Sequence, residues 1–432
     1  MNPDVALPTL AGTLLCLLGF ARFPTRMTEL LAPRFVIPAV LWMSTFGKAL
    51  LAPPAKMQFV DYAVQTYSGE ALWFVNLCVA AFWAGYALPV GKWLSRLIPD
   101  LSFSLSISPR LLMALATCLA AYIHVIPHVA FAFGAIQGLL LRAASAAALG
   151  GAALVGVAWG SSRKTQLAGV VLGAVLLFAY SAKFMATFSR GSGLPVLMAV
   201  FAASYVRREI RVVPLTLALA WTIYAGVQGL SGRAIYGHFS GLGSYWTNIL
   251  EHPIPRVQDP SHLLVLFHDV YSPLCVSVRA RSEGATLTGV MDPRDWLLNQ
   301  IPVPRFLGLP NWTVNLGKYI TGNRKTEWGY TNSMVGDLYL HFGRRGCFGF
   351  LVVGIVYRAV AVIVTRVFST TTVIFDWYAL IGLATYYAFA LGMYNNFRSW
   401  NNFIFYAIYA TLGLYLVSRP FARTQPALSF SR

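Results

Sequence analysis

Runs of about twenty mostly apolar residues recur along this chain, separated by short polar breaks, and they constrain its fold more than any other feature. Apolar residues make up 57% of the 432 residues, charged residues make up only 11%, and the mean hydropathy is +0.60. A water-soluble protein of this length needs many more charged side chains to cover its surface. A surface in contact with lipid has no such need, because apolar side chains can face the acyl chains. The sequence therefore predicts an integral membrane protein of the all-α class.

The apolar runs predict about 11 transmembrane helices. They lie near residues 5–21, 35–52, 71–90, 111–130, 144–160, 166–183, 193–206, 212–229, 347–364, 374–393 and 402–418. With the first span running inward, every segment on the inner side contains Arg or Lys, such as Arg22 after the first span and Arg207 after the seventh. Cytoplasmic loops of membrane proteins carry this excess of basic residues. The pattern therefore predicts an N-terminus on the outer side.

The same pattern divides the chain into three parts. Residues 1–229 are expected to form an N-terminal transmembrane bundle of about eight spans, and residues 347–432 about three further spans and a short cytoplasmic tail. Between them, residues 230–346 form one large loop on the outer side, rich in Pro, Trp and Tyr. A loop of this length is too long to be a simple connector. We expect a folded cap of short, irregular helices that closes over a membrane-level cavity.

Local patterns predict details of packing and of helix ends. Asp292 is expected to cap a helix of the large loop, with Pro293 at the first helical position. Residues 261–274 have apolar residues at helical spacing and end beside a proline. Two GxxxG spacings occur in adjacent spans, at Gly156/Gly160 and Gly169/Gly173. These spacings favour close helix packing over any catalytic role.

Arginines on the outer side are candidate ligands for a phosphate group. Arg190, in FSRGSG, and Arg398, in YNNFRSWNN, lie in short outer loops, where membrane orientation does not call for positive charge. Arg279 and Arg305 lie in the large loop. Guanidinium groups bind phosphate with paired donors and stay ionised when they are desolvated. The alternative is that these side chains reach lipid headgroups or form structural ion pairs.

A general base is expected among the acidic and histidine side chains of the large loop. The candidates are His262, His268, Asp269, Glu327, Asp337 and His341. His268 stands beside Asp269 on an amphipathic stretch, and Asp337 stands in a distinctive motif, so Asp337 and His268 are preferred. The five cysteines indicate no disulfide framework, and no CxxC or HExxH spacing suggests a metal site. We therefore predict neither a metal nor another cofactor.

Residues 331–358, TNSMVGDLYLHFGRRGCFGFLVVGIVYR, resemble the segment that enters a late span in bacterial oligosaccharide repeat-unit polymerases of the Wzy type. That family tends to show a small polar stretch, a glycine, an acidic residue, an aromatic residue, then Phe-Gly and another glycine. The acidic position falls on Asp337, where the family commonly has Glu. FSRGSG is similar to the family's outer-loop arginine segment, at Arg190, and IPVPRF to its proline–arginine element, at Arg305. O-antigen ligases share the same architecture.

The resemblance implies a metal-independent glycosyltransferase of the bacterial inner membrane, with its large loop in the periplasm. It would polymerise O-antigen or exopolysaccharide repeat units carried on undecaprenyl diphosphate, with Asp337 or His268 as the base. The diphosphate would be bound by Arg190, Arg398, Arg305 and Arg279. The implied partners are the lipid-linked oligosaccharide, membrane lipid and a chain-length regulator protein, with no nucleic acid.

Three alternatives stay open at this point. An O-antigen ligase-like transferase would use the same chemistry on another acceptor. A transporter or flippase for an anionic, lipid-linked solute would explain the spans and the outer basic residues equally well. It predicts inverted repeats and ionisable groups at mid-membrane, and the sequence shows neither clearly. A purely structural subunit of an envelope complex would leave the basic content of the cap without an explanation.

Overall fold

The computed structural model describes residues 3–22, 33–51, 58–89, 93, 108–132, 137–161, 167–207, 209, 211–237, 241–255, 269–285, 287, 290, 292–300, 316–321 and 332–370. Across these ranges the chain forms helices joined by turns, and no β-strand occurs within them. The prediction of an all-α fold is confirmed for this part of the chain.

Every predicted span that falls on described residues coincides with a helix. These are α1 (Pro3–Arg22), α2 (Pro33–Trp42) continued by the π-helical turn η2 (Met43–Gly47) and α3 (Lys48–Leu51), α4 (Gln58–Ala87), α6 (Pro109–Val129), α7 (Gln137–Ser161), α8 (Leu167–Met185), α9 (Leu194–Arg207), α10 (Val212–Tyr236) and α16 (Phe348–Thr370). Five of them, α1, α4, α6, α8 and α10, are long and apolar enough to cross a membrane. The predicted spans 374–393 and 402–418 lie outside the described residues, so a total of about 11 stays a prediction.

Short helices occupy the predicted cap. They are α11 (Gly241–Glu251), α12 (Tyr271–Ser282), α13 (Pro293–Asn299), α14 (Leu316–Thr321), α15 (Met334–Phe342) and the 3-10 turn η6 (Gly343–Cys347). The predicted cap of α13 is confirmed, because the Asp292 carboxylate accepts a hydrogen bond of 2.9 Å from the Asp295 N–H and Pro293 lies in the first turn.

One helix boundary was predicted wrongly. The apolar stretch at 261–274 was expected to end beside Pro273, whereas α12 begins at Tyr271 and continues through Pro273. A proline is tolerated in a first helical turn because the N–H groups there have no acceptor within the helix. Residues 261–268 lie outside the described residues.

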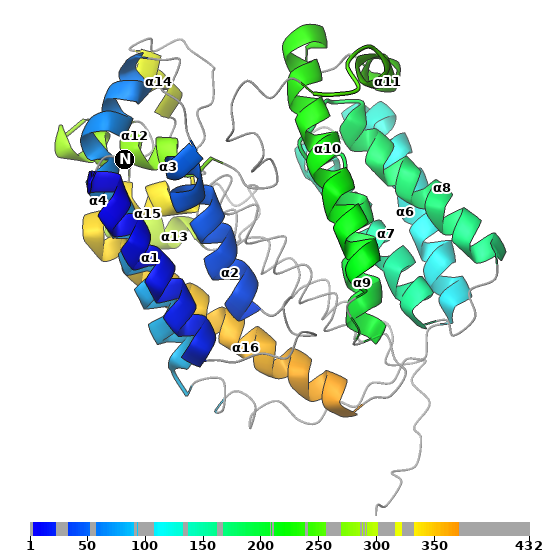
Figure 1. The fold of residues 1–432 in the computed structure, drawn as a ribbon, viewed down its shortest axis with the longest axis horizontal. Helices are drawn as coiled ribbons and strands as arrows, with labels where there is room; N and C mark the ends of the chain where they lie inside the picture. Colours follow the sequence, from blue (N-terminus) through cyan, green and yellow to red (C-terminus); the bar gives the residue numbers. More distant parts are fainter. Residues whose placement is uncertain are drawn as a thin grey trace, which may run out of the picture.

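The described helices pack into two groups, which Figure 1 shows side by side. In the first group α4 is the central element, and it packs against α1, α12 and α16 around a core that includes Phe74, Cys78 and Phe82. In the second group α7 packs against α6, α8 and α9, and α10 packs against α9 and α11. The first group therefore brings together helices from the start of the chain, α1 and α4, and helices that come after α11 in the sequence, such as α12 and α16.

Close helix packing at the GxxxG spacings is confirmed. Gly156 and Gly160 face α9, and a Cβ atom at Gly156 would lie 2.1 Å from the backbone oxygen of Ala199. A Cβ atom at Gly173 of α8 would lie 2.3 Å from the indole ring of Trp159 on α7. Any side chain larger than hydrogen would push these helices apart.

Helix α4 begins well before the span predicted at 71–90. It contains 30 residues, which corresponds to a length of about 45 Å, longer than the ~30 Å hydrocarbon core of a bilayer. Hydropathy did not detect its first half because that half contains Asp61 and Glu70 among apolar residues. This extension packs against α12 and η6 and supports the candidate site.

Candidate functional site

Asp337 and His341 form the centre of the candidate site. They lie one turn apart on α15, and their side chains are only 9% and 3% exposed. His341 Nδ1 lies 3.3 Å from Asp337 Oδ1 and 2.8 Å from the backbone oxygen of Asp337. Residues four apart face each other along a helix, so the sequence spacing produces this pair. The carboxylate favours a proton on Nδ1, which leaves Nε2 as the basic nitrogen of the imidazole.

The start of α15 is fixed by its capping residues. The Ser333 hydroxyl accepts a hydrogen bond of 3.1 Å from the Gly336 N–H, and the Asp337 N–H donates to the Ser333 carbonyl at 2.7 Å. A Cβ atom at Gly336 would lie 2.1 Å from Asn332 Oδ1, so only glycine allows this close approach. Asp337 in the first turn also interacts favourably with the positive end of the helix dipole.

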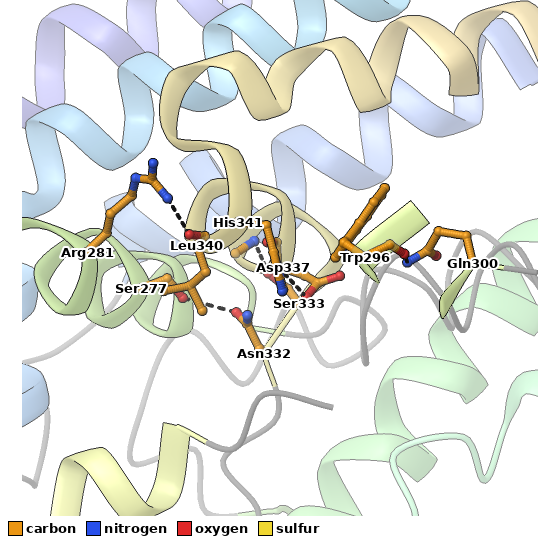
Figure 2. A network of polar contacts seen from close by, with 10 residues as sticks. Ser277, Arg281, Trp296, Gln300, Asn332, Ser333, Asp337, Leu340 and His341 are labelled. Atoms are coloured by element: carbon orange, nitrogen blue, oxygen red, sulfur yellow. Dashed lines mark hydrogen bonds and ion pairs between the residues drawn. The ribbon is translucent and has the colours of Figure 1, made fainter. Parts of the chain in front are cut away.

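Helix α12 holds α15 at both of its ends, as Figure 2 shows. The Ser277 hydroxyl lies 3.0 Å from Asn332 Oδ1 and 2.8 Å from the Pro273 carbonyl oxygen. Near the other end, Arg281 Nη1 donates to the backbone oxygen of Leu340. Hydrogen bonds to both ends restrict rotation of α15 and so keep the Asp337–His341 pair in one orientation.

Helix α13 covers the pair on one side (Figure 2). The Trp296 ring is buried, with its centroid 6.1 Å from that of His341 and 4.9 Å, edge to face, from that of Phe342. Gln300 Nε2 donates to the Trp296 carbonyl at 3.1 Å. The short helix capped by Asp292 thus places an aromatic ring against the imidazole.

A second polar contact joins α15 to the extension of α4. The Tyr339 hydroxyl donates to Glu70 Oε1 at 2.7 Å, and Arg344 Nη2 lies 3.4 Å from the same oxygen. Burial and the hydrogen bond to Glu70 raise the pKa of Tyr339, so its hydroxyl stays a donor at neutral pH. Sequence reasoning missed Glu70. The available signal was an acidic residue at the edge of an apolar run.

Arg279, predicted to bind diphosphate, lies in a network with protein partners. Its Nε donates to Glu283 Oε1 at 2.7 Å, its Nη1 donates to the Phe59 carbonyl at 3.3 Å, and its guanidinium stacks 3.9 Å from the Phe59 ring. Tyr319 donates to the other oxygen of Glu283. The hydrogen bond from Tyr319, followed by the one from Arg279, lowers the pKa of Glu283. A diphosphate at Arg279 would have to compete with Glu283.

Arg190 lies in the turn between α8 and α9, with its side chain half-buried. Phe188 of this turn is buried and has a φ of 46°, which is unfavourable for a residue other than glycine. Arg233 Nη2 donates to the Phe188 carbonyl at 3.0 Å, and Thr222 Oγ1 donates to the Gly193 carbonyl at 3.1 Å, so α10 holds the turn in place. Within the described part of the chain, Arg190 forms no ion pair.

The predicted site residues are not all brought together. Arg190 belongs to the second group of helices and Asp337 to the first, and among the described elements no closely packed pair of helices joins the two groups. His268, Arg305 and Arg398 lie outside the described residues, so their roles stay predictions. In the described ranges, no cluster of three or more His, Cys, Asp or Glu side chains is placed to hold a metal ion.

Comparison of the chain with protein-family models, with curated proteins and with solved structures finds no match. The features that bear on function are therefore the apolar helices, the geometry of α15 and the sequence motifs around them.

Proposed function

We propose that this protein is a multi-pass glycosyltransferase of a bacterial inner membrane that polymerises oligosaccharide repeat units carried on undecaprenyl diphosphate, at the periplasmic face. The observation that carries the proposal is the buried Asp337–His341 pair. It lies inside the segment whose sequence resembles repeat-unit polymerases, on a short helix of the predicted cap. Its neighbours α12 and η6 pack against α4, which is long and apolar enough to cross a membrane. A carboxylate that orients an imidazole is a standard arrangement for taking a proton from a hydroxyl.

In the proposed reaction, a hydroxyl of the incoming unit attacks the anomeric carbon of the growing chain. The new carbon–oxygen bond forms as the bond from the anomeric carbon to the diphosphate oxygen breaks, and undecaprenyl diphosphate leaves with the electron pair. His341 Nε2 takes the hydroxyl proton, and Asp337 stabilises the imidazolium that results. Arginines such as Arg190 neutralise the negative charge of the leaving group.

This chemistry requires access to His341. Because the His341 side chain is only 3% exposed and Trp296 packs against it, the acceptor hydroxyl can reach Nε2 only after α13 has shifted. Helix α13 therefore moves away from His341 when the acceptor binds.

The test is to incubate purified protein with undecaprenyl-diphosphate-linked repeat units and to separate the products by length. The wild-type protein should give a ladder of longer chains. His341→Gln and Asp337→Asn should fold normally, as judged by thermal unfolding, yet their rate of polymer formation should be about 10²–10⁴-fold lower than that of the wild-type protein. Asp295→Asn, at an exposed carboxylate on α13, is the matched control and should keep full activity.

Other outcomes assign other functions. If the folded His341→Gln and Asp337→Asn proteins still form polymer at the wild-type rate, the Asp337–His341 pair takes no part in the reaction. Transfer of a finished chain to a different lipid acceptor would identify a ligase. Movement of the lipid-linked sugar across a vesicle membrane without any joining would identify a transporter.

A further inference from the structure

Helix α11 runs across the helices on which it packs. Figure 1 shows α11 nearly end-on at one end of the second group, whereas α8 and α10 lie lengthwise in the same view. Because α8 and α10 are long and apolar enough to cross a membrane, a helix perpendicular to them lies along the membrane surface. Helix α11 also contacts the turn that carries Arg190, since the Gly241 N–H donates to the Ala186 carbonyl at 3.2 Å.

Buried hydrogen bonds fix the orientation of α11. Asn248 Nδ2 donates to Gln228 Oε1 at 2.8 Å, and Gln228 Nε2 donates to the His252 carbonyl at 2.8 Å. The Tyr245 hydroxyl donates to the Ala225 carbonyl, also at 2.8 Å. Asn248, Gln228 and Tyr245 are fully buried, so rotating α11 about its axis would leave polar groups without partners in the protein interior. These hydrogen bonds therefore fix which residues of α11 face the protein and which face its surroundings.

The three sides of α11 differ in character. Successive residues are about 100° apart around a helix axis, so Trp246 and Leu250 share one flank while Ser244 and Glu251 share the opposite flank. Tyr245 lies between these flanks, on the side that faces the protein. A helix with a protein-facing side, an apolar flank and a polar flank suits the boundary between lipid and water.

The apolar flank of α11 continues the exposed apolar face of α8. Trp246 stacks on Phe178 of α8, with centroids 6.4 Å apart and planes 22° apart, and Phe178 and Val175 are themselves exposed. One turn beyond Trp246, Leu250 is 80% exposed, and Ile254 just past the helix is 84% exposed. A continuous apolar surface that begins on a membrane-crossing helix indicates the same surroundings along its length, namely lipid.

We infer that α11 is an interfacial helix on the outer surface of the membrane, with Leu250 and Ile254 among the lipid acyl chains and Trp246 at the level of the headgroups. The inference depends on the proposed membrane location but not on polymerase activity. Because α11 contacts the turn between α8 and α9, an interfacial α11 also places Arg190 of that turn at the level of the lipid phosphates in the membrane.

The test uses the full-length protein with its five cysteines replaced, reconstituted into phosphatidylcholine–phosphatidylglycerol vesicles. A fluorophore is attached at Leu250→Cys, at Ile254→Cys, or at Ser244→Cys on the opposite flank. Nitroxide lipids that carry the quencher near the headgroup end of the acyl chain should quench the labels at 250 and 254 and leave the label at 244 bright. Val171→Cys, exposed on α8, marks the membrane itself.

The results separate this inference from the proposed function. If the label at 171 is quenched while those at 250 and 254 respond no more than that at 244, α11 is not interfacial and the inference is overturned. If those two labels are shielded from both nitroxide lipid and aqueous iodide, a protein partner covers the flank, and the inference is again overturned. If the label at 171 is not quenched either, the membrane location fails, and the proposed function fails with it.

Discussion

The crossing of α4 and α16 allows a quantitative test of the fold. A Cβ atom at Gly354 of α16 would lie 2.2 Å from the Phe82 carbonyl oxygen and 2.8 Å from the Tyr86 nitrogen on α4. In the opposite direction, a Cβ atom at Gly85 would lie 2.1 Å from the Leu351 carbonyl oxygen. Carbon and oxygen atoms in close contact are normally about 3.3–3.6 Å apart, so Gly354→Ala requires the two backbones to separate by roughly 1 Å.

The expected cost follows from two opposing effects. Overpacking a tight contact costs about 1–3 kcal/mol, and the higher helix propensity of alanine offsets up to ~1 kcal/mol of that. Because the contact at Gly354 is about 1 Å too short for a Cβ atom, its cost lies near the upper end of that range, and Gly354→Ala should be less stable by about 2 kcal/mol. At roughly 2 cal/mol/K of unfolding entropy per residue, this lowers the unfolding midpoint of the 432-residue chain by about 2 °C. Thermal unfolding of the purified protein in detergent measures this. Because η6 and α15 precede α16, polymer formation should fall as well.

Gly150→Ala is the matched control. It makes the same substitution inside α7, where a Cβ atom would meet nothing within 4 Å, so the midpoint should stay the same or rise. The reasoning is refuted if Gly354→Ala unfolds at the wild-type temperature, because the backbones of α4 and α16 would then not approach as closely as described.

Three further predictions concern single side chains. Arg190→Lys keeps the charge but loses the planar donor pair, so the protein should fold normally while polymer formation falls about 10²–10³-fold. Arg211→Lys, at the residue just before α10, should stay active. The hydrogen bond from a tyrosine and then the adjacent guanidinium lower the pKa of Glu283, so the stability that this carboxylate contributes is present above its ordinary pKa of 4.5 and is lost as the pH falls through the lowered value. The thermal unfolding temperature of the wild-type protein should therefore fall when the pH is lowered below 4.5, and it should fall less over the same pH range in Glu283→Gln. Tyr339→Phe removes the donor to Glu70 and should cost about 0.5–1.5 kcal/mol, measured by thermal unfolding, and an unchanged midpoint would mean that this hydrogen bond adds nothing to stability.

Features set by local sequence were predictable. The helices at the predicted spans form because hydropathy acts over about twenty successive residues, which one sequence window contains. The Asp292 cap of α13 depends on three neighbouring residues. The Asp337–His341 pair was also within reach, since both residues were candidates and a spacing of four places them on one helix face.

Features set by distant residues were not predictable. Glu70 meets Tyr339 across 269 residues, and no local pattern signals such a contact. The sequence also could not show that Arg279 already has a carboxylate and an aromatic ring as partners, because Phe59 lies 220 residues earlier in the chain. The start of α4 was missed for a related reason, since its polar first half becomes a stable helix by packing against α12.

The pairing of α4 with α12 and α15 has a consequence for synthesis. A ribosome that adds about 5–20 residues per second needs roughly 13–54 s to make the 269 residues between Glu70 and Tyr339. During that interval α4 is already made, but the surface that later binds α12 and α15 has no partner. Contacts of the second group span shorter separations, such as 64 residues between Tyr180 and Ala116, so that group can assemble first. Helix α4, although it is synthesised early, is thus among the last helices to gain all of its packing partners. Until then its unpaired surface has to be kept from packing against incorrect partners.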